Sequence, residues 1–344
     1  MDLSGRPLFF CRLSLNLSIG PGRMLRPLIL DTDGGVDDAQ ALLMLLAAGR
    51  APQIVTTVFG NVGLRDATRN ILSVLGLAGR ADIPVHAGAD RPLVQPILDA
   101  TRIHGADGLG GAPRPAVIPD LAGHDGISVL VSRLQAAARA GGKVDLLMIG
   151  PLTNLALALR LAPDCAAGIG RVTLMGGSSH GRGNITPAAE FNIFADPEAA
   201  AIVLGAEIEI VIVPWETCAA HRMTGAEVDA LFDSVPDGPC KAFSKALADH
   251  ARATIAGFGG GDHFRFVDPL AAAVAIDPGI VTTSFRASVE VALAPGPARG
   301  MTVVDPSGRL GPPTRTFVET VESARLVALF RASLSEPVPQ RADR

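Results

Sequence analysis

Four carboxylates lie within eight residues near the start of the chain, where they could hold a cation. The segment reads Asp31-Thr32-Asp33-Gly34-Gly35-Val36-Asp37-Asp38. Crowded carboxylates repel one another and raise one another's pKa unless a cation neutralises them. Oxygen ligands of this kind select Ca²⁺ or Mg²⁺. A structural interpretation also exists for Asp37 and Asp38, since carboxylates at a helix start cap free N–H groups.

Further ligands for such a cation must come from other parts of the chain. The acidic segment is not the calcium loop of an EF-hand, because no matching Glu follows it. Asp268 precedes the helix-like run Ala271–Ala275 and could be either a ligand or a helix cap. The Ile149-Gly150 peptide ends an apolar run and can offer a backbone carbonyl. We therefore expect a metal site assembled from distant segments.

Short apolar runs alternate with helix-like segments from Pro27 onward. The strand candidates are residues 28–30, 54–59, 83–85, 144–149, 172–175 and 208–213, and the helix candidates are residues 39–48, 68–77, 127–140, 155–161, 197–204 and 271–275. The strands are apolar on both faces. This rhythm predicts an α/β fold of Rossmann-like type, with a mostly parallel central sheet and helices on both faces.

Polar residues follow four of the predicted strands. The segments are Asp31-Thr32-Asp33, Gly60-Asn61, Gly150-Pro151-Leu152-Thr153-Asn154 and Gly176-Gly177. In an open parallel sheet, ligands bind where the carboxyl ends of the strands gather. We therefore expect the acidic segment to form part of a ligand site at that edge.

Composition limits the partners of the protein. The chain has 344 residues, 48% of them hydrophobic, and a net charge of −4, which gives no electrostatic reason to expect a nucleic acid or an anionic membrane. No apolar run reaches the roughly 18 residues of a membrane helix. The four cysteines form no C-x-x-C pair, which favours free thiols in a reducing cytoplasm.

The domain organisation predicted from the sequence is simple. Residues 24–336 show no repeat, low-complexity tract or convincing linker and are expected to form a single domain. Met24 directly precedes the first good strand and is the expected natural start. Residues 1–23 are expected to be an extension outside the fold, and residues 337–344 a C-terminal tail.

Motifs along nearly the whole chain, from residue 26 to about 335, resemble one enzyme family. They are DTDGGVDD (31–38), TTVFGN (56–61), DIPVHAGADRPL (82–93), IHGADGLGG (103–111), GPLTNLALAL (150–159), GNITPAAEFNIFADPEAA (183–200), VDPLAA (267–272) and RGMTVVD (299–305). Together they resemble the inosine/uridine-preferring nucleoside hydrolases, calcium-dependent enzymes with the opening fingerprint D-T-D-P-G-x-D-D. Gly34 stands here in place of the proline.

The resemblance implies a function and a role for each matching residue. The expected reaction is hydrolysis of the N-glycosidic bond of a small-molecule ribonucleoside by a calcium-bound water, with Asp33 as the general base. The Ca²⁺ ligands would be Asp33, Asp38, Asp268 and the main-chain carbonyl of Ile149. The residues that contact the ribose would be Asp37, Asn61, Met175, Asn184, Glu190 and Asn192. Phe191 and His104 would lie near the leaving base, and Asp31 would support the metal-binding loop without binding the metal. A homodimer or homotetramer is also implied.

The base-binding half of the site departs from the family pattern. Many family members have His, and purine-selective members Trp, directly before the last metal-ligating Asp, where this chain has Val267. Valine can neither donate a proton nor stack on a base. The chain has no tyrosine, and its only tryptophan is Trp215. His104 and His263 are the candidates for protonating the leaving base, and the glycines at 259–261 suggest a mobile flap beside His263.

The sequence leaves two other functions and the choice between purine and pyrimidine bases open. A nucleoside-binding protein of the same fold could have kept the ribose site and lost turnover, as Val267 suggests. An apolar strand that ends in D-x-D-G also opens Mg²⁺-dependent phosphatases. Those enzymes need a later Lys and a second acidic pair after a strand, and the sequence shows no clear match to either.

Overall fold

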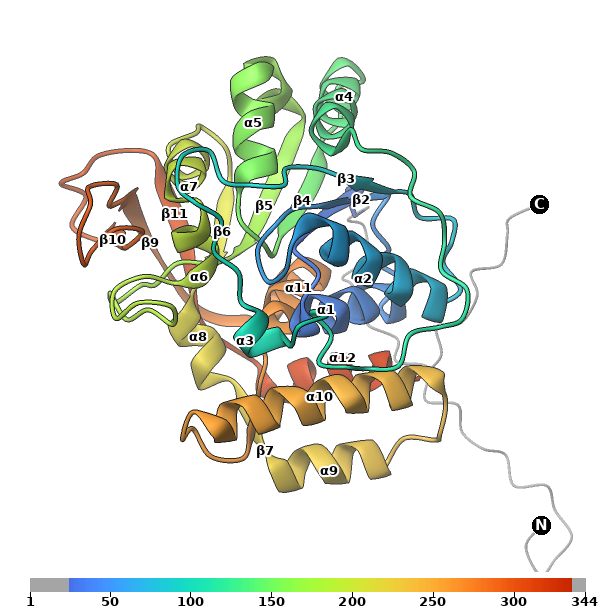
Figure 1. The fold of residues 1–344 in the computed structure, drawn as a ribbon. Coiled ribbons are helices and arrows are strands. Elements are labelled where there is room, and N and C mark those ends of the chain that lie inside the picture. Colours follow the sequence, from blue (N-terminus) through green and yellow to red (C-terminus); the bar gives the residue numbers. More distant parts are fainter. Residues whose placement is uncertain (1–24, 336–344) are drawn as a thin grey trace, which may run out of the picture.

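The computed structural model describes residues 25–335 (Figure 1). The extension predicted over residues 1–23 and the tail predicted over 337–344 lie outside this range. Among the helices of the described residues, none is both long and apolar enough to span a membrane.

One nine-stranded sheet forms the centre of the molecule. In sheet order its strands are β10 (Thr302–Asp305), β9 (Val281–Val291), β11 (Thr314–Val321), β6 (Ile210–Val213), β5 (Ile169–Met175), β4 (Val144–Met148), β1 (Leu28–Thr32), β2 (Ile54–Thr57) and β3 (Val85–Ala87). The strands from β11 to β3 pair in parallel, and β9 and β10 extend the sheet by antiparallel pairing. The predicted mostly parallel sheet is confirmed, whereas the antiparallel extension was not predicted.

Helices cover both faces of the sheet, as predicted (Figure 1). One face carries α1 (Val36–Ala47), α2 (Leu64–Leu77), α11 (Asp268–Ile276) and α12 (Ser323–Ser333), and the other carries α4 (Gly126–Arg139), α5 (Thr153–Leu161) and α7 (Pro197–Leu204). The side chains of β1 alternate between the two cores: Leu28 and Leu30 pack with the first group of helices, and Ile29 with the second. β1 is buried on both faces, and Asp31 and Thr32 at its carboxyl end are buried as well.

The remaining elements frame the carboxyl edge of the sheet or flank the domain. They are α3 (Thr101–His104), α6 (Phe191–Ala195), α8 (Trp215–Ala220), α9 (Gly225–Asp233), α10 (Pro239–Gly257), the two-stranded ribbon of β7 (Arg222–Thr224) and β8 (His263–Arg265), and the 3₁₀ turns η1 (Pro163–Gly168) and η2 (Pro278–Ile280). The sequence analysis predicted none of these elements.

The predicted element boundaries are off by a few residues. The helix predicted over 271–275 begins at Asp268, because Pro269 lacks only an N–H that is unbonded in a first helical turn. The strand predicted over 83–85 is instead β3, which begins after Pro84, a residue with no N–H to give to a ladder. The first shift matters for function, because it places Asp268 at a helix start that faces the acidic segment.

Candidate functional site

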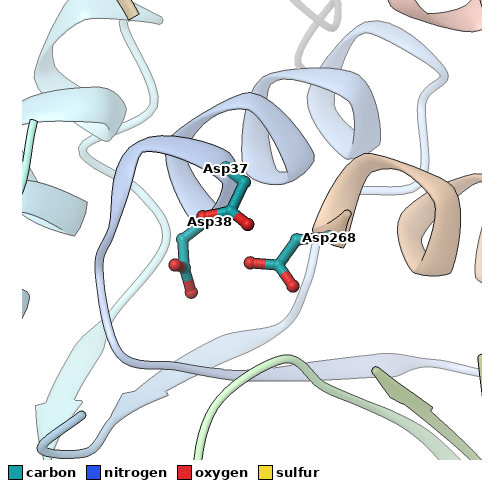
Figure 2. A group of neighbouring side chains, drawn as sticks. All are labelled: Asp37, Asp38 and Asp268. Carbon is teal, nitrogen blue, oxygen red and sulfur yellow. The ribbon is translucent and has the colours of Figure 1, made fainter. Parts of the chain in front are cut away.

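Three carboxylates from two helix starts converge at the carboxyl edge of β1. Asp37 and Asp38 stand in the first turn of α1, and Asp268 begins α11. Figure 2 shows the three side chains turned toward one another, and one oxygen from each lies within 4.8 Å of the others. Asp38 and Asp268 were predicted as metal ligands and Asp37 as a ribose contact. The structure thus brings together an oxygen set of the kind that holds a hard divalent cation.

Asp33 joins this group through a shared hydrogen-bond donor. The Asn61 side-chain amide donates to Asp33 Oδ1 at 2.9 Å and to Asp38 Oδ2 at 3.0 Å, and the Asn61 backbone N–H donates to Asp33 Oδ2 at 2.8 Å. The Thr32 hydroxyl also donates to Asp38. Thr32 was not assigned a role from the sequence, although it stands between two aspartates of the motif. These donors fix the orientation of both carboxylates.

Burial disfavours the ionised forms of the aspartates in this group. The pKa of Asp33 and of Asp268 is raised well above its usual range, by burial first and by neighbouring aspartates next. Burial likewise raises the pKa of Asp37 to about 6. Asp37 Oδ1 is buried and accepts no hydrogen bond within residues 25–335. An oxygen without a donor beside crowded carboxylates fits a bound cation, whose charge would favour the ionised forms.

Two glycines allow this close packing. Gly34 has φ +66°, and a Cβ there would lie 2.5 Å from the Ala67 carbonyl oxygen. A proline has φ near −65°, so the family fingerprint's proline cannot adopt the backbone seen here. A Cβ on Gly60 would lie 2.0 Å from Asp33 Oδ2. Gly60 therefore lets the loop after β2 approach the Asp33 carboxylate.

Asp31 is not one of the three converging carboxylates. Its Oδ2 accepts hydrogen bonds from the Thr56 hydroxyl at 2.5 Å and from the Asn154 amide at 2.7 Å. Burial raises the pKa of Asp31 to about 7. Asn154 also accepts from the Ala89 N–H at 2.8 Å, which ties three loops together. From the sequence, Asn154 was not predicted to hold Asp31, although it follows a predicted strand.

A second polar group lies at the ends of β4 and β5. The Asn192 amide donates to the Met175 carbonyl at 3.2 Å and to the Ile149 carbonyl at 3.4 Å. Glu190 caps α6 and accepts from the N–H groups of Asn192 at 2.9 Å and of Gly177 at 2.8 Å. Burial raises the pKa of Glu190 to about 7. The Ile149 carbonyl, a predicted metal ligand, thus lies beside three predicted ribose contacts.

Asn184 and Phe191 are joined by one hydrogen bond. Asn184 Oδ1 accepts from the Phe191 N–H at 2.8 Å. Asn184 is exposed, whereas Phe191 is buried against Val58 and Phe59. The loop that carries Asn184 is therefore the outer wall of the site.

Two residues that the sequence analysis missed hold this loop at its start. Glu216 in α8 accepts from the Ser178 hydroxyl at 2.8 Å and from the N–H groups of Ser179 at 3.0 Å and His180 at 2.8 Å. The Thr302 hydroxyl donates to the Ser178 carbonyl at 2.6 Å and accepts from its N–H at 2.9 Å. No local motif marks these contacts, because each partner is more than 30 residues away in the sequence.

His104 lies at the rim of the carboxylate group in its neutral form. Its Nδ1 accepts a hydrogen bond from the Val36 N–H at 3.1 Å and lies 3.6 Å from Asp37 Oδ1. An acceptor at Nδ1 assigns the proton to Nε2. Burial lowers the pKa of His104 to about 4. His104 can therefore donate a hydrogen bond from Nε2 but carries no second proton near neutral pH.

The structure does not join His263 to the carboxylate group. His263 pairs with Thr224 in the β7–β8 ribbon, and within residues 25–335 it makes no hydrogen bond or ion pair to an aspartate of the group. Val267 is half-buried and packs against the core beside α8. The glycines predicted to form a flap, at 259–261, precede β8 in the chain.

Comparisons with known proteins agree with this architecture. The family model described as inosine-uridine preferring nucleoside hydrolase matches residues 28–328. A non-specific ribonucleoside hydrolase, RihC, of Klebsiella pneumoniae (strain 342) is 36% identical over 313 residues, which cover 86% of this chain and 93% of that protein. The solved structure of a plant nucleoside hydrolase has a TM-score of 0.80 and 29% sequence identity, and the match covers 91% of this chain and 100% of that chain. An inosine-guanosine nucleoside hydrolase structure also has a TM-score of 0.80, with 28% identity, and the match covers 90% of this chain and 99% of that chain. The chain belongs to the inosine-uridine preferring nucleoside hydrolase family.

Proposed function

We propose that this protein hydrolyses the N-glycosidic bond of ribonucleosides and releases ribose and the free base, with Ca²⁺ as its metal. The observation that carries the proposal is the convergence of Asp37, Asp38 and Asp268 beside Asp33. These side chains would hold the cation together with the Ile149 carbonyl. When bound, Ca²⁺ would supply positive charge that orients ribose hydroxyls and a water molecule. The choice of Ca²⁺ over Mg²⁺ rests on the family resemblance.

Asp33 is the proposed general base. It would remove a proton from the attacking water, and its carboxylate would be ionised beside a divalent cation. The bond to the base breaks through a ribosyl cation, and the buried oxygens of Glu190 and Asn192 would stabilise its positive charge. Asp37, Asn61, Asn184 and Met175 would complete the ribose site. Phe191 would contact the leaving base, and Asp31 would keep the metal loop in place.

A nucleoside-binding protein without turnover is the second candidate. Val267 favours it, because an apolar side chain cannot protonate the departing base. The neutral state of His104 also favours it, because a histidine with a pKa of about 4 is a poor acid catalyst near pH 7. The phosphatase alternative loses its support, because the family match spans residues 28–328.

The organisation of the protein is part of the proposal. Residues 24–336 would act as one domain, because the nine-stranded sheet joins strands from β1 to β11. A cytoplasmic location is supported by Cys165 and Cys218, which are buried free thiols. The homodimer or homotetramer rests on the family resemblance alone.

Sugar discrimination tests the proposed ribose site. A site built to hydrogen-bond a hydroxyl leaves buried polar groups unpaired when that hydroxyl is missing. We expect kcat/KM for a 2′-deoxyribonucleoside to be lower by on the order of 10²-fold or more than for the matching ribonucleoside. A change of base at constant sugar should matter less. Equal rates on the two sugars would overturn the assignment of the ribose site.

A further inference from the structure

A cavity of about 390 Å³ lies beside the loop that carries Asn184, outside the site described above. It is lined by Arg182, Trp215, Glu216, Ala219, Ala220 and Arg222. These residues come from the loop between β5 and α6, from α8 and from β7, which directly follows α8; Figure 1 shows the loop next to α8. None of the predicted metal or ribose residues lines this cavity.

The guanidinium groups of the two lining arginines have no partner among the described residues. Arg182 and Arg222 are exposed, and within residues 25–335 neither guanidinium takes part in a hydrogen bond or an ion pair. Glu216 is the only acid of the lining. Its oxygens are already engaged by the Ser178 hydroxyl and by the N–H groups of Ser179 and His180. The cavity wall therefore has free donors and a surplus of positive charge.

A third guanidinium lies against the tryptophan of the lining. The Arg265 side chain lies over the Trp215 ring, 5.6 Å from its centroid. Its Nε is buried and has no hydrogen-bond partner among the described residues. Burial lowers the pKa of Arg265, and the charge of Arg222 lowers it further. Two arginines that repel each other beside an aromatic ring form an arrangement that a bound anion would relieve.

We propose that this cavity binds a phosphate group. Guanidinium groups match phosphate oxygens with paired, charge-assisted hydrogen bonds, and they stay charged at any physiological pH. The phosphate could be inorganic phosphate or the phosphate of a nucleoside 5′-monophosphate, whose base could stack on Trp215. Arg182 lies two residues from Asn184, so a phosphate held there would also fix the outer wall of the ribose site.

The chain has one tryptophan and no tyrosine, so its aromatic emission comes from Trp215 in the lining of this cavity. Inorganic phosphate, adenosine 5′-monophosphate and adenosine would be titrated into the calcium-free protein, with sodium chloride keeping the ionic strength constant. We expect both phosphates to change the emission in a saturable way, with a Kd on the order of 1 mM or below. Tighter binding of the monophosphate would identify a nucleotide site, and equal binding a site for free phosphate.

Variants separate this cavity from the active site. The Arg182→Ala and Arg222→Ala double variant should weaken phosphate binding at least about tenfold, which is about 1.4 kcal/mol. Arg139→Ala, which removes an exposed arginine of α4, is the matched control and should bind phosphate like the wild type. Asp33→Asn should also keep the response. The proposal is overturned if phosphate leaves the emission unchanged, if adenosine alone produces the same change, or if the double variant binds as tightly as the wild type.

Discussion

Asp33 is the residue on which the proposed chemistry depends most. Its carboxylate is fully buried and is held by two donors of Asn61. Asp33→Asn keeps the shape of the side chain but removes the base and a metal ligand together. We expect kcat to fall by on the order of 10³-fold or more. The measurement is the rate of ribose release at saturating substrate.

A matched control checks that this loss is specific. Asp233→Asn makes the same chemical change at an exposed position at the end of α9. It should leave both kcat and the melting temperature unchanged. If Asp33→Asn kept a tenth of the wild-type rate, Asp33 would not be the base.

In the proposed reaction, Val267 is expected to determine how the base leaves. Protonation of a leaving group is worth about 10²–10⁴-fold in rate, and neither Val267 nor neutral His104 can supply it. We therefore expect the rate to rise steeply with the acidity of the leaving group, so that p-nitrophenyl riboside is cleaved much faster than inosine or uridine. The measurement is a plot of log kcat/KM against leaving-group pKa.

Alanine variants of the two histidines test the alternative. If His104 or His263 has become the acid, the plot should be shallow for the wild type, and His104→Ala or His263→Ala should steepen it. Rapid inosine or uridine hydrolysis in a variant that lacks both histidines would show that the acid lies elsewhere.

At the scale of the elements, α8 holds the loop that forms the outer wall of the proposed ribose site. Glu216 accepts from Ser178, Ser179 and His180, and Thr302 holds the same loop from β10. Glu216→Ala should release the loop and raise KM for ribonucleosides by about tenfold, the effect of losing about 1.4 kcal/mol of binding. Since Glu216 does not touch the carboxylate group, kcat should change much less. Steady-state kinetics on one ribonucleoside measures both values.

Glu216→Gln is the conservative partner of this variant. Its amide oxygen can still accept from a backbone N–H, so the rise in KM should be smaller than for Glu216→Ala. If Glu216→Ala instead lowered kcat and left KM unchanged, Glu216 would not act by positioning the loop.

The sequence predicted the elements that carry strong apolar patterns. Leu28–Leu30 and the strands parallel to it are buried on both faces, and they appear in the sequence as short apolar runs. Strand β9 was missed because Thr282, Thr283 and Ser284 are exposed, so it lacks such a run. The acidic segment and its position at a strand end were predictable for the same local reason. The hydrogen bond from Ser178 to Glu216 was not predictable, because it joins residues that only the folded chain brings together.

At the scale of the whole molecule, the buried carboxylates link stability to pH and to metal. Burial raises the pKa of Asp37 to about 6 and of Asp31 to about 7, from an ordinary value of about 4 in an unfolded chain. When folding raises the pKa of an acid, the contribution of that acid to stability is complete at pH values below its pKa in the unfolded chain. This contribution is lost as the pH rises through its pKa in the folded protein. The metal-free protein should therefore lose stability between about pH 4 and pH 7.

Calcium should reverse this loss. A cation that binds only the folded state adds about 2.7 kcal/mol when its free concentration is 100 times its Kd. Protons compete with it at low pH, so the rise in melting temperature on adding Ca²⁺ to EGTA-treated protein should be larger at pH 8 than at pH 5.5. Thermal denaturation at the two pH values measures it. Identical melting temperatures with Ca²⁺ and with EGTA at pH 8 would show that the group holds no calcium.

The proposed function requires calcium-dependent turnover of ribonucleosides. The most direct measurement is reducing-sugar release from inosine, adenosine, uridine and cytidine by the purified protein in EGTA, and again after CaCl₂ is added in excess. We predict release of ribose and free base in equal amounts from at least one of the four nucleosides with Ca²⁺, and loss of that activity in EGTA. If none of the four releases ribose with Ca²⁺, or if release is the same in EGTA, the proposed function is wrong.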